Sequence, residues 1–214
     1  MQGADWDARY AAEPTLWGAE PNRFVRERVA GSEPGRAVDL ACGNGRNALW
    51  LARRGWQVAG VDISGVALEQ ATKRSAELGS PVVWEQADAR SWAPPQPVDL
   101  ILVAYLHLPV TELIAVLSAA GEHLTPTGRL LYIGHSRTNL THGFGGPSDP
   151  GVLAEIADLA AAAAGLAVRE LAHLFRPTEQ GDAIDIVLDA TPWPPPSAAE
   201  VVEKHPGGAR VARR

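Results

Sequence analysis

One stretch of sequence decides the fold: residues 38–48 read Val-Asp-Leu-Ala-Cys-Gly-Asn-Gly-Arg-Asn-Ala. The apolar run at 37–41 predicts a buried strand, and the run at 47–52 predicts a helix. Between them, Gly43 and Gly45 permit a positive φ and let backbone N–H groups approach a ligand closely. Because a helix N-terminus favours anionic groups, this strand–turn–helix unit is typical of a site that holds a carboxylate or a phosphate.

Strands and helices alternate along the chain outside this stretch. Further strands are expected at 57–61, 81–85, 98–104 and 128–134, helices at 64–78, 110–124 and 152–164, and a Gly- and Pro-rich loop at 136–150. This alternation predicts an α/β fold with a doubly wound, parallel sheet. Two last strands, near 167–175 and 183–188, flank a short turn and predict a hairpin that closes the sheet.

Composition and charge narrow the range of functions. The chain has 214 residues, which suits one domain. Its formal net charge is −6 and the predicted fold contains no basic patch, so nucleic acid is not an expected partner. The lone cysteine, Cys42, cannot form an intramolecular disulfide, and the N-terminus lacks a signal-peptide pattern, so a cytoplasmic location is expected. No run is apolar enough to span a bilayer and no histidine pair has metal-binding spacing, so we expect neither a membrane partner nor a metal site. Nothing in the sequence indicates an oligomeric state.

Three segments are expected along the chain. Residues 1–35 form an N-terminal cap with a helix, and residues 36–190 form the cofactor-binding core. Residues 191–214 are rich in proline and end in basic residues, and prolines from Pro192 onward oppose a helix or a central strand. A disordered tail is the favoured interpretation, with a binding arm as the alternative.

Acidic residues at or near the predicted strand ends point to a cofactor with a ribose and an amine. Asp62 closes the second strand, where its carboxylate can accept hydrogen bonds from ribose hydroxyls or cap the next helix. Asp39 suits a cationic amino-acid ligand, and Asp88 can accept a hydrogen bond from an adenine amino group. The run at 43–48 also satisfies the G-x-G-x-x-A pattern of nicotinamide enzymes, but the chain has no Tyr-x-x-x-Lys pair for hydride chemistry. Together these features favour S-adenosylmethionine as the cofactor.

Residues 38–62 resemble the cofactor-binding half of class I S-adenosylmethionine-dependent methyltransferases. The run at 39–52 is especially similar to the branch that contains tellurite-resistance and thiopurine methyltransferases. The looser likeness extends over residues 6–190 and implies a Rossmann-like sheet of seven strands whose last strand is antiparallel. The cofactor-binding residues that it implies are Trp17, Asp39, Ala41, Gly43, Gly45, Asn47, Asp62, Ile63, Asp88, Ala89, Val103 and Ala104.

The resemblance implies a place for each part of the cofactor. The acid of the first strand and the two glycines surround the methionine part, and Asp62 holds the ribose. Ile63 packs on the adenine, Asp88 and Ala89 meet its edge, and the last residues of the fourth strand lie under the sulfonium. Ala41 stands where a glycine is usual, and we expect its methyl group to be tolerated.

The N-terminal segment carries several aromatic residues, Trp6, Tyr10, Trp17 and Phe24. In similar enzymes such a segment closes over the cofactor, which excludes water and completes the pocket. An amphipathic helix that packs on the sheet is the alternative, and the two interpretations are compatible.

Methyl transfer is an in-line displacement at a cationic sulfur, so the protein mainly positions the reactants and excludes water. A general base is needed only for an acceptor that arrives protonated. The candidates follow the fourth and fifth strands: Tyr105, His107 and His135. We favour His135, because it opens the 136–150 loop and because an unperturbed imidazole has a pKa of about 6.5. His107 is also consistent with a packed or capping histidine.

The sequence therefore predicts an S-adenosylmethionine-dependent methyltransferase with a small-molecule acceptor. The fourth strand lacks the Asn/Asp-Pro-Pro-Tyr run of enzymes that methylate the amino groups of adenine or glutamine. The resemblance suggests soft sulfur, selenium or tellurium nucleophiles, and hydroxyl, amine and carboxylate acceptors stay open. Two alternatives are a non-catalytic S-adenosylmethionine-binding protein and an NAD(P)-binding oxidoreductase.

Overall fold

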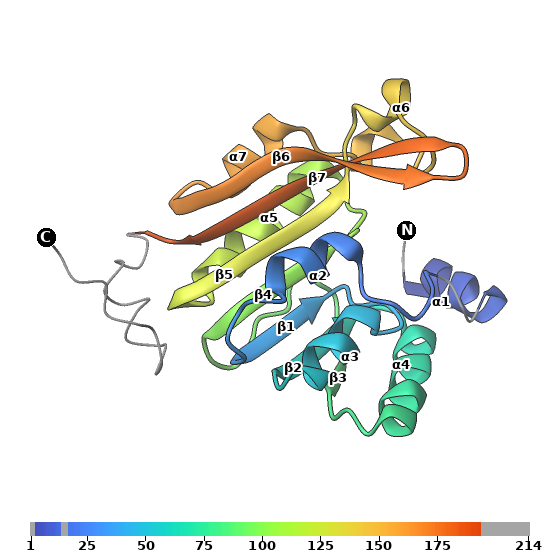
Figure 1. Ribbon diagram of the computed structural model, residues 1–214, viewed down its shortest axis with the longest axis vertical. Coiled ribbons are helices and arrows are strands. Elements are labelled where there is room, and N and C mark those ends of the chain that lie inside the picture. Colours follow the sequence, from blue (N-terminus) through green and yellow to red (C-terminus); the bar gives the residue numbers. More distant parts are fainter. Residues whose placement is uncertain (1–2, 14–16, 194–214) are drawn as a thin grey trace, which may run out of the picture.

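The computed structural model of the chain describes residues 3–13 and 17–193. A seven-stranded sheet runs through the middle of the molecule, and helices cover both of its faces (Figure 1). The strands are β1 (Arg36–Leu40), β2 (Gln57–Asp62), β3 (Val83–Gln86), β4 (Val98–Ala104), β5 (Leu124–His135), β6 (Leu166–Thr178) and β7 (Gly181–Pro192). The helices are α1 (Gly3–Ala12), α2 (Arg23–Val29), α3 (Arg46–Arg53), α4 (Gly65–Leu78), α5 (Val110–Glu122), α6 (Asn139–His142) and α7 (Ile156–Ala162), with a short 3₁₀ turn at Pro150–Val152.

The strand order is β3-β2-β1-β4-β5-β7-β6. The pairs among β3, β2, β1, β4 and β5 are parallel, and β7 lies antiparallel between β5 and β6. This order confirms the predicted Rossmann-like α/β fold with an antiparallel last strand. The carboxyl ends of β1, β2, β4 and β5 consequently meet at one edge of the sheet, where ligands bind in open α/β folds.

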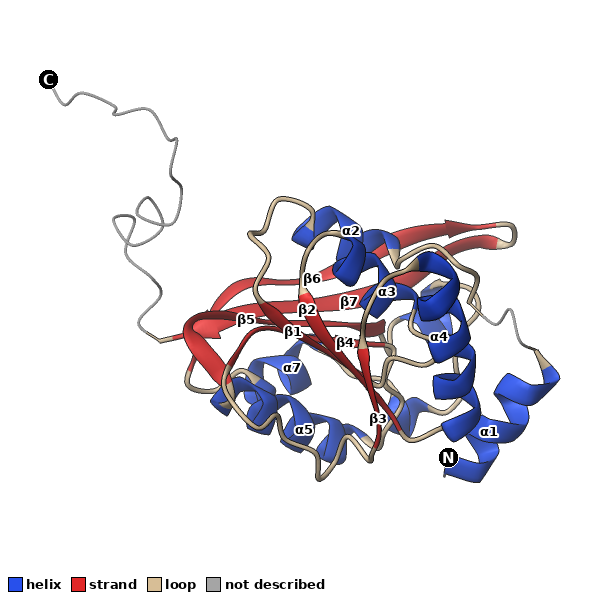
Figure 2. Cartoon of the chain, turned by 90° about the horizontal axis from the view of Figure 1, so that it is seen from below, coloured by secondary structure: helices blue, strands red, loops and turns tan. Residues whose placement is uncertain are grey.

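Two hydrophobic clusters fill the space between the sheet and its helices. Helices α5 and α7 pack on one face through residues such as Leu117 and Leu159, and α2 and α3 pack on the other through residues such as Val25 and Leu51. Figure 2 shows these two layers, with α4 on the side of α3 and with α1 beyond α4. None of the helices in the described ranges is long and apolar enough to cross a membrane.

Local capping signals set several helix ends as expected. The Ser64 hydroxyl accepts a hydrogen bond from the Ala67 amide at 3.1 Å and caps the N-terminus of α4. Gly79 ends the same helix in the left-handed conformation, with a φ of 59°. The Asn22 side chain accepts from the amides of Phe24 and Val25 and caps α2, a signal that the sequence-based reasoning did not use.

The C-terminal half differs from the prediction in several places. Helix α7 begins at Ile156 rather than near 152, because Ala154 bridges to Ser136 and keeps the chain extended there. The predicted loop at 136–150 contains the short helix α6. Strand β5 begins at Leu124, where the predicted helix still continued, and an irregular register opposite β4 accommodates its first residues.

Strand β7 continues through Pro192, although proline was expected to oppose a central strand. Pairing of β7 with β5 ends at Ala190, so Pro192 pairs with β6 alone. On the side toward β5, Pro192 has no strand partner, so its missing N–H breaks no hydrogen bond between these two strands. The rest of the predicted tail, residues 194–214, lies outside the described residues.

Candidate active site

The glycine turn after β1 has an unusual backbone. Ala41, Gly43 and Gly45 all have positive φ angles, of 61°, 55° and 79°. Glycine adopts this conformation at little cost, whereas alanine does so with strain of about 1–2 kcal/mol. Ala41 therefore stands at a position whose backbone conformation favours glycine.

Asp62, at the end of β2, holds this turn in place. Its Oδ2 accepts a hydrogen bond from the Gly43 amide at 2.7 Å, and its Oδ1 accepts one from the Ser64 amide at 2.9 Å. Burial raises the pKa of Asp62, while these backbone hydrogen bonds lower it in part. Asp62 thus acts as a local cap, and both of its oxygens already contact backbone.

Asp39, on β1, is completely buried and only half satisfied. Its Oδ2 accepts from the Ala48 amide in the first turn of α3 at 3.0 Å, whereas its Oδ1 has no partner among the described residues. Burial raises the pKa of Asp39 to about 7. A buried acceptor without a donor is costly, so this oxygen is a candidate acceptor for a donor group of a ligand.

The two glycines of the turn have different neighbours. A Cβ on Gly43 would overlap the hydroxyl of Tyr10, and a Cβ on Gly45 would overlap the indole of Trp84. Gly60 on β2 faces the same indole. Gly45 therefore allows Trp84 to pack closely beneath the start of α3, in addition to any contact with a ligand.

Helix α1 covers the glycine turn from the N-terminal side. Asp7 accepts hydrogen bonds from the Ser64 hydroxyl at 2.6 Å and from the Val66 amide at 3.1 Å, at the N-terminus of α4. Gln70 on α4 donates to the carbonyl of Tyr10 at 2.9 Å. Ile63, expected beside the adenine, contacts the start of α1 at Gly3. The cap thus closes over the turn and also packs on a core helix.

Two further predicted cofactor residues connect this cap to α3. The carbonyl of Trp17 accepts a hydrogen bond from the Arg46 guanidinium at 2.8 Å. The Trp17 residue is about half exposed, and its ring lies beside Arg9. The Oδ1 of Asn47 accepts from the Asn22 amide at 2.8 Å. Both residues therefore have protein partners that hold the N-terminal segment against the turn.

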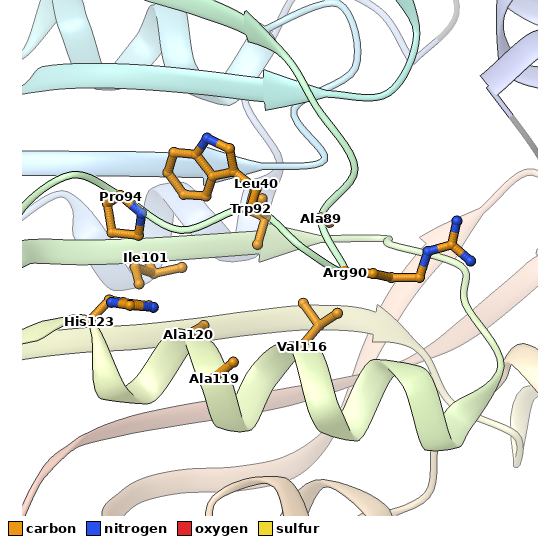
Figure 3. Close-up of a pocket in the computed structure, with 10 residues that line it drawn as sticks. All are labelled: Leu40, Ala89, Arg90, Trp92, Pro94, Ile101, Val116, Ala119, Ala120 and His123. Carbon is orange, nitrogen blue, oxygen red and sulfur yellow. The ribbon is translucent and has the colours of Figure 1, made fainter.

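The residues predicted to meet the adenine edge lie differently. The carboxylate of Asp88 is bound by the guanidinium of Arg90 at 2.6 Å, and this contact lowers the pKa of Asp88. Ala89 lines a small apolar cavity of about 30 Å³ between β4 and α5, together with Trp92 and Val116 (Figure 3). A cavity of this size admits one water molecule rather than a cofactor, and Ala89 is the only predicted cofactor residue in its lining.

The residues at the end of β4 differ in burial. Val103 is completely buried in the core below the edge, and Ala104 is half-buried. Tyr105 follows with a positive φ of 59°, which turns the chain out of the strand. Of the two residues, Ala104 is therefore the more accessible at the carboxyl edge of the sheet.

The three predicted catalytic residues form one cluster. The rings of Tyr105 and His135 lie 4.9 Å apart, and the ring of His107 stacks on that of His135 at 5.9 Å and 13°. Burial and the neighbouring His135 lower the pKa of His107 to about 4, so His107 is neutral at pH 7. Burial raises the pKa of Tyr105, and Asp185 adds to that effect, so its hydroxyl keeps its proton.

Asp185, on β7, joins this cluster and was missed by the sequence-based reasoning. It pairs in register with His135 on β5, and its Oδ1 lies 2.9 Å from Nδ1 of His135, close enough for an ion pair although the angle is poor for a hydrogen bond. Its Oδ2 accepts from the Tyr105 hydroxyl and from Nε of Arg176, both at 2.8 Å. An acid within the apolar run at 183–188 was the available signal.

The loop after β5 lies against His135. Asn139 donates to the Gly145 carbonyl at 2.7 Å and accepts from the Ile184 amide at 2.6 Å, which holds the loop on β7. A Cβ on Gly146 would lie 3.1 Å from the imidazole of His135. The loop thus brings the backbone of Gly146 against the imidazole of His135.

Residues 37–128 match the family model described as a methyltransferase domain. The chain is similar to trans-aconitate 2-methyltransferase of Azoarcus sp. (strain BH72), with 39% identity over 112 residues, 50% of this chain and 42% of the relative. It is also similar to ubiquinone biosynthesis O-methyltransferase of Vibrio cholerae, with 28% identity over 131 residues, 59% of this chain and 53% of the relative. The chain thus spans about half the length of these curated relatives.

Two solved structures share the fold. TehB from Haemophilus influenzae superposes with a TM-score of 0.68 at 16% identity, over 87% of this chain and 67% of that chain. The N-methyltransferase NodS from Bradyrhizobium japonicum WM9, in complex with S-adenosyl-L-homocysteine, superposes with a TM-score of 0.67 at 17% identity, over 88% and 96%. At these identities the likeness concerns the fold.

Proposed function

The chain has the fold of class I S-adenosylmethionine-dependent methyltransferases, and from this premise we propose that it is an enzyme that transfers a methyl group from S-adenosylmethionine to a small-molecule acceptor. The observation that carries the proposal is the agreement between the family match and the site. The matched residues include the glycine turn, Asp39 and Asp62. At this place Oδ1 of Asp39 is buried without a donor from any residue that the structure describes.

The residues of the turn fit this cofactor. The free Oδ1 of Asp39 offers an acceptor for an ammonium group, and a cationic ligand favours the ionised form of a carboxyl whose pKa is raised. The N-terminus of α3 favours the cofactor's carboxylate. Asp62 has two backbone partners, but each carboxylate oxygen can accept a second hydrogen bond, so it can also hold ribose hydroxyls.

When bound, S-adenosylmethionine supplies an electrophilic methyl group on a cationic sulfur. The protein holds the acceptor in line with that methyl group and keeps water away, and the position of α1 over Gly43 serves the second task. His135, at the carboxyl end of β5, is the residue that we propose as the base for an acceptor that arrives protonated.

Two observations support a small-molecule acceptor. The names of the two curated relatives refer to trans-aconitate and to ubiquinone biosynthesis, which are small-molecule systems. Gly146 also lies close to the His135 ring, since a Cβ there would be 3.1 Å from it, and so restricts the space around that ring. A screen of carboxylic acids, phenols, amines and thiols as acceptors identifies the atom that receives the methyl group.

Titration calorimetry tests the cofactor, and product analysis tests the reaction. We expect S-adenosylmethionine and S-adenosylhomocysteine to bind and NAD to give no heat. Micromolar NAD binding without a response to the methyl donor contradicts the proposal. Binding of both sulfur compounds without methylation of any acceptor class would instead indicate a cofactor-binding protein without catalysis.

A further inference from the structure

Strand β7 carries two buried acids with different surroundings. Asp189, which is 4% exposed, pairs with Arg129 through two contacts of 2.7 and 2.6 Å. Asp185, which is completely buried, contacts Arg176 and additionally the Tyr105 hydroxyl and the His135 imidazole. Charge compensation alone needs only the arginine, so the two extra contacts of Asp185 call for another explanation.

We propose that Asp185 is a positioning residue that holds His135 with its Nδ1–H toward the carboxylate, so that Nε2 is the atom that accepts the acceptor's proton. This inference rests on the proposed function, because it assigns a role within the proposed methyl transfer. It differs from that proposal in naming the residue that sets the protonation and the orientation of the base.

The geometry around the imidazole supports this assignment. An ionised carboxylate can only accept, so a nitrogen 2.9 Å from Asp185 is held there favourably when it carries the proton. Nε2 of His135 has no hydrogen bond within the part of the chain that the structure describes, and the side chain is 10% exposed. Nδ1 also lacks a hydrogen bond of good angle, so its short contact with the Asp185 carboxylate is what distinguishes the two nitrogens.

The carboxylate itself is held on more than one side. Tyr105, which follows β4, and Nε of Arg176 on β6 both donate to its Oδ2 at 2.8 Å. Its Oδ1 receives a longer contact from Nη2 of Arg176, at 3.4 Å, and lies 2.9 Å from Nδ1 of His135. Burial acts to raise the pKa of Asp185, but the contacts with His135 and Arg176 outweigh it, so the pKa is lowered and the group stays ionised at neutral pH. His107, whose ring stacks on that of His135, is neutral at that pH because its pKa is lowered to about 4.

The proton transfer balances without another reactant. The bond between the acceptor atom and its hydrogen breaks, and an N–H bond forms at Nε2 of His135. The electron pair stays on the acceptor atom and forms the new bond to the methyl group, while the pair of the broken sulfur–methyl bond stays on sulfur. Asp185 keeps its charge throughout and stabilises the imidazolium.

The first test is made on the wild-type protein without an acceptor, and a variant serves only to assign the signal. The ¹⁵N chemical shifts of the imidazole nitrogens, measured on labelled wild-type protein above the titration range, report which nitrogen carries the proton. We expect the Nδ1–H tautomer for His135, whose signal is identified by its absence in His135→Gln. An Nε2–H tautomer in the wild-type protein overturns the proposal.

The second test compares two variants of the same strand. In Asp185→Asn the new amide can donate to Nδ1, so we expect the Nε2–H tautomer and a kcat lower by about 10²-fold or more. Cofactor affinity should stay near the wild-type value, and Asp185→Glu should recover part of the turnover. Asp189→Asn is the control: it also breaks a buried ion pair, and we expect a lower melting temperature with an unchanged tautomer and pH–rate profile.

If Asp185→Asn and Asp189→Asn show the same His135 tautomer and the same loss of kcat, Asp185 has only a structural role and the proposal is overturned. A wild-type protein that fails to bind S-adenosylmethionine contradicts the proposed function instead, and the tautomer measurement still decides the role of Asp185. The two failures are therefore distinguishable.

Discussion

Ala41 is held in a conformation that suits glycine. Its φ of 61° costs about 1–2 kcal/mol for a residue with a Cβ, and the greater backbone entropy of an unfolded glycine offsets about half of that. We expect Ala41→Gly to raise the free energy of unfolding by about 0.5–1 kcal/mol, measured by urea denaturation.

Ala37→Gly is the matched control for this substitution. Ala37 is buried on β1, the strand that precedes Ala41, and has no positive φ, so its replacement should destabilise the protein through lost packing and greater unfolded-state entropy. If both variants lower the stability equally, the left-handed conformation of Ala41 stores no strain.

Asp39 makes stability depend on pH. Burial raises its pKa to about 7 from an ordinary 3.8, so its contribution to stability is fully present below about pH 4 and is lost as the pH rises through 7. Asp39→Asn cannot ionise. The difference in unfolding free energy, variant minus wild type, should therefore rise between pH 4 and 8 by on the order of 3 kcal/mol.

Urea unfolding at several pH values checks this trend. A difference that stays constant with pH would show that Asp39 does not titrate in that range. In the same variant we expect weaker binding of S-adenosylmethionine, because the amide places no negative charge beside the cofactor's ammonium group.

At the scale of elements, the packing of α3 against β2 depends on one indole. Gly60 has no positive φ, so a methyl group there acts only through its overlap with Trp84. We expect Gly60→Ala to lower the free energy of unfolding by about 1–3 kcal/mol, as overpacking does. Adding Trp84→Leu should recover part of that loss, and a double-mutant cycle measures the coupling. If the changes in unfolding free energy of the two single variants simply add in the double variant, Gly60 and Trp84 do not pack against each other as described.

Helix α1 is held mainly by α4 and contributes little to the two main hydrophobic clusters. We therefore expect removal of residues 3–12 to leave the sheet folded, as judged by circular dichroism. Dissociation of S-adenosylhomocysteine should become about tenfold faster or more in stopped-flow measurements, because the cover over Gly43 is lost.

Asp7→Ala should change the dissociation rate in the same direction by a smaller factor, since Asp7 accepts two of the hydrogen bonds that dock α1. Ala8→Ser, at the exposed neighbouring position, serves as the control. If the shortened chain releases the product at the parent rate, α1 is not a lid.

For the whole molecule, cofactor binding should appear as added stability. A ligand at a hundred times its Kd stabilises the folded state by about 2.7 kcal/mol, which corresponds to about 5–10 °C in Tm for a chain of this size. We expect this shift with S-adenosylmethionine and with S-adenosylhomocysteine in a thermal melt. The same concentration of NAD should leave the Tm unchanged, and a shift with NAD alone would contradict the cofactor assignment.

Much of the fold was predictable, because its signals are local. The strand over 98–104 and the helix between Ser64 and Gly79 appear with the predicted bounds, since apolar runs and caps act within a few residues. The start of α7 was wrong by four residues, because the contact that delays it, between Ser136 and Ala154, joins distant parts of the chain.

The candidate site was predictable in part. The sequence placed the glycine turn at the end of β1 and grouped Tyr105, His107 and His135 at one edge, because the ends of parallel strands meet there. It did not anticipate that Asp88 binds Arg90, two residues away, in place of a free carboxylate.

The sequence by itself determined the strand–turn–helix unit, because steric limits on φ and hydrophobic periodicity act through near neighbours. Only the tertiary structure decided which polar groups meet. Asp185 reaches His135 because β7 inserts antiparallel between β5 and β6 in one register, and a shift by one residue would turn its side chain to the other face of the sheet. Such partners are fixed by long-range strand pairing, which no local pattern records.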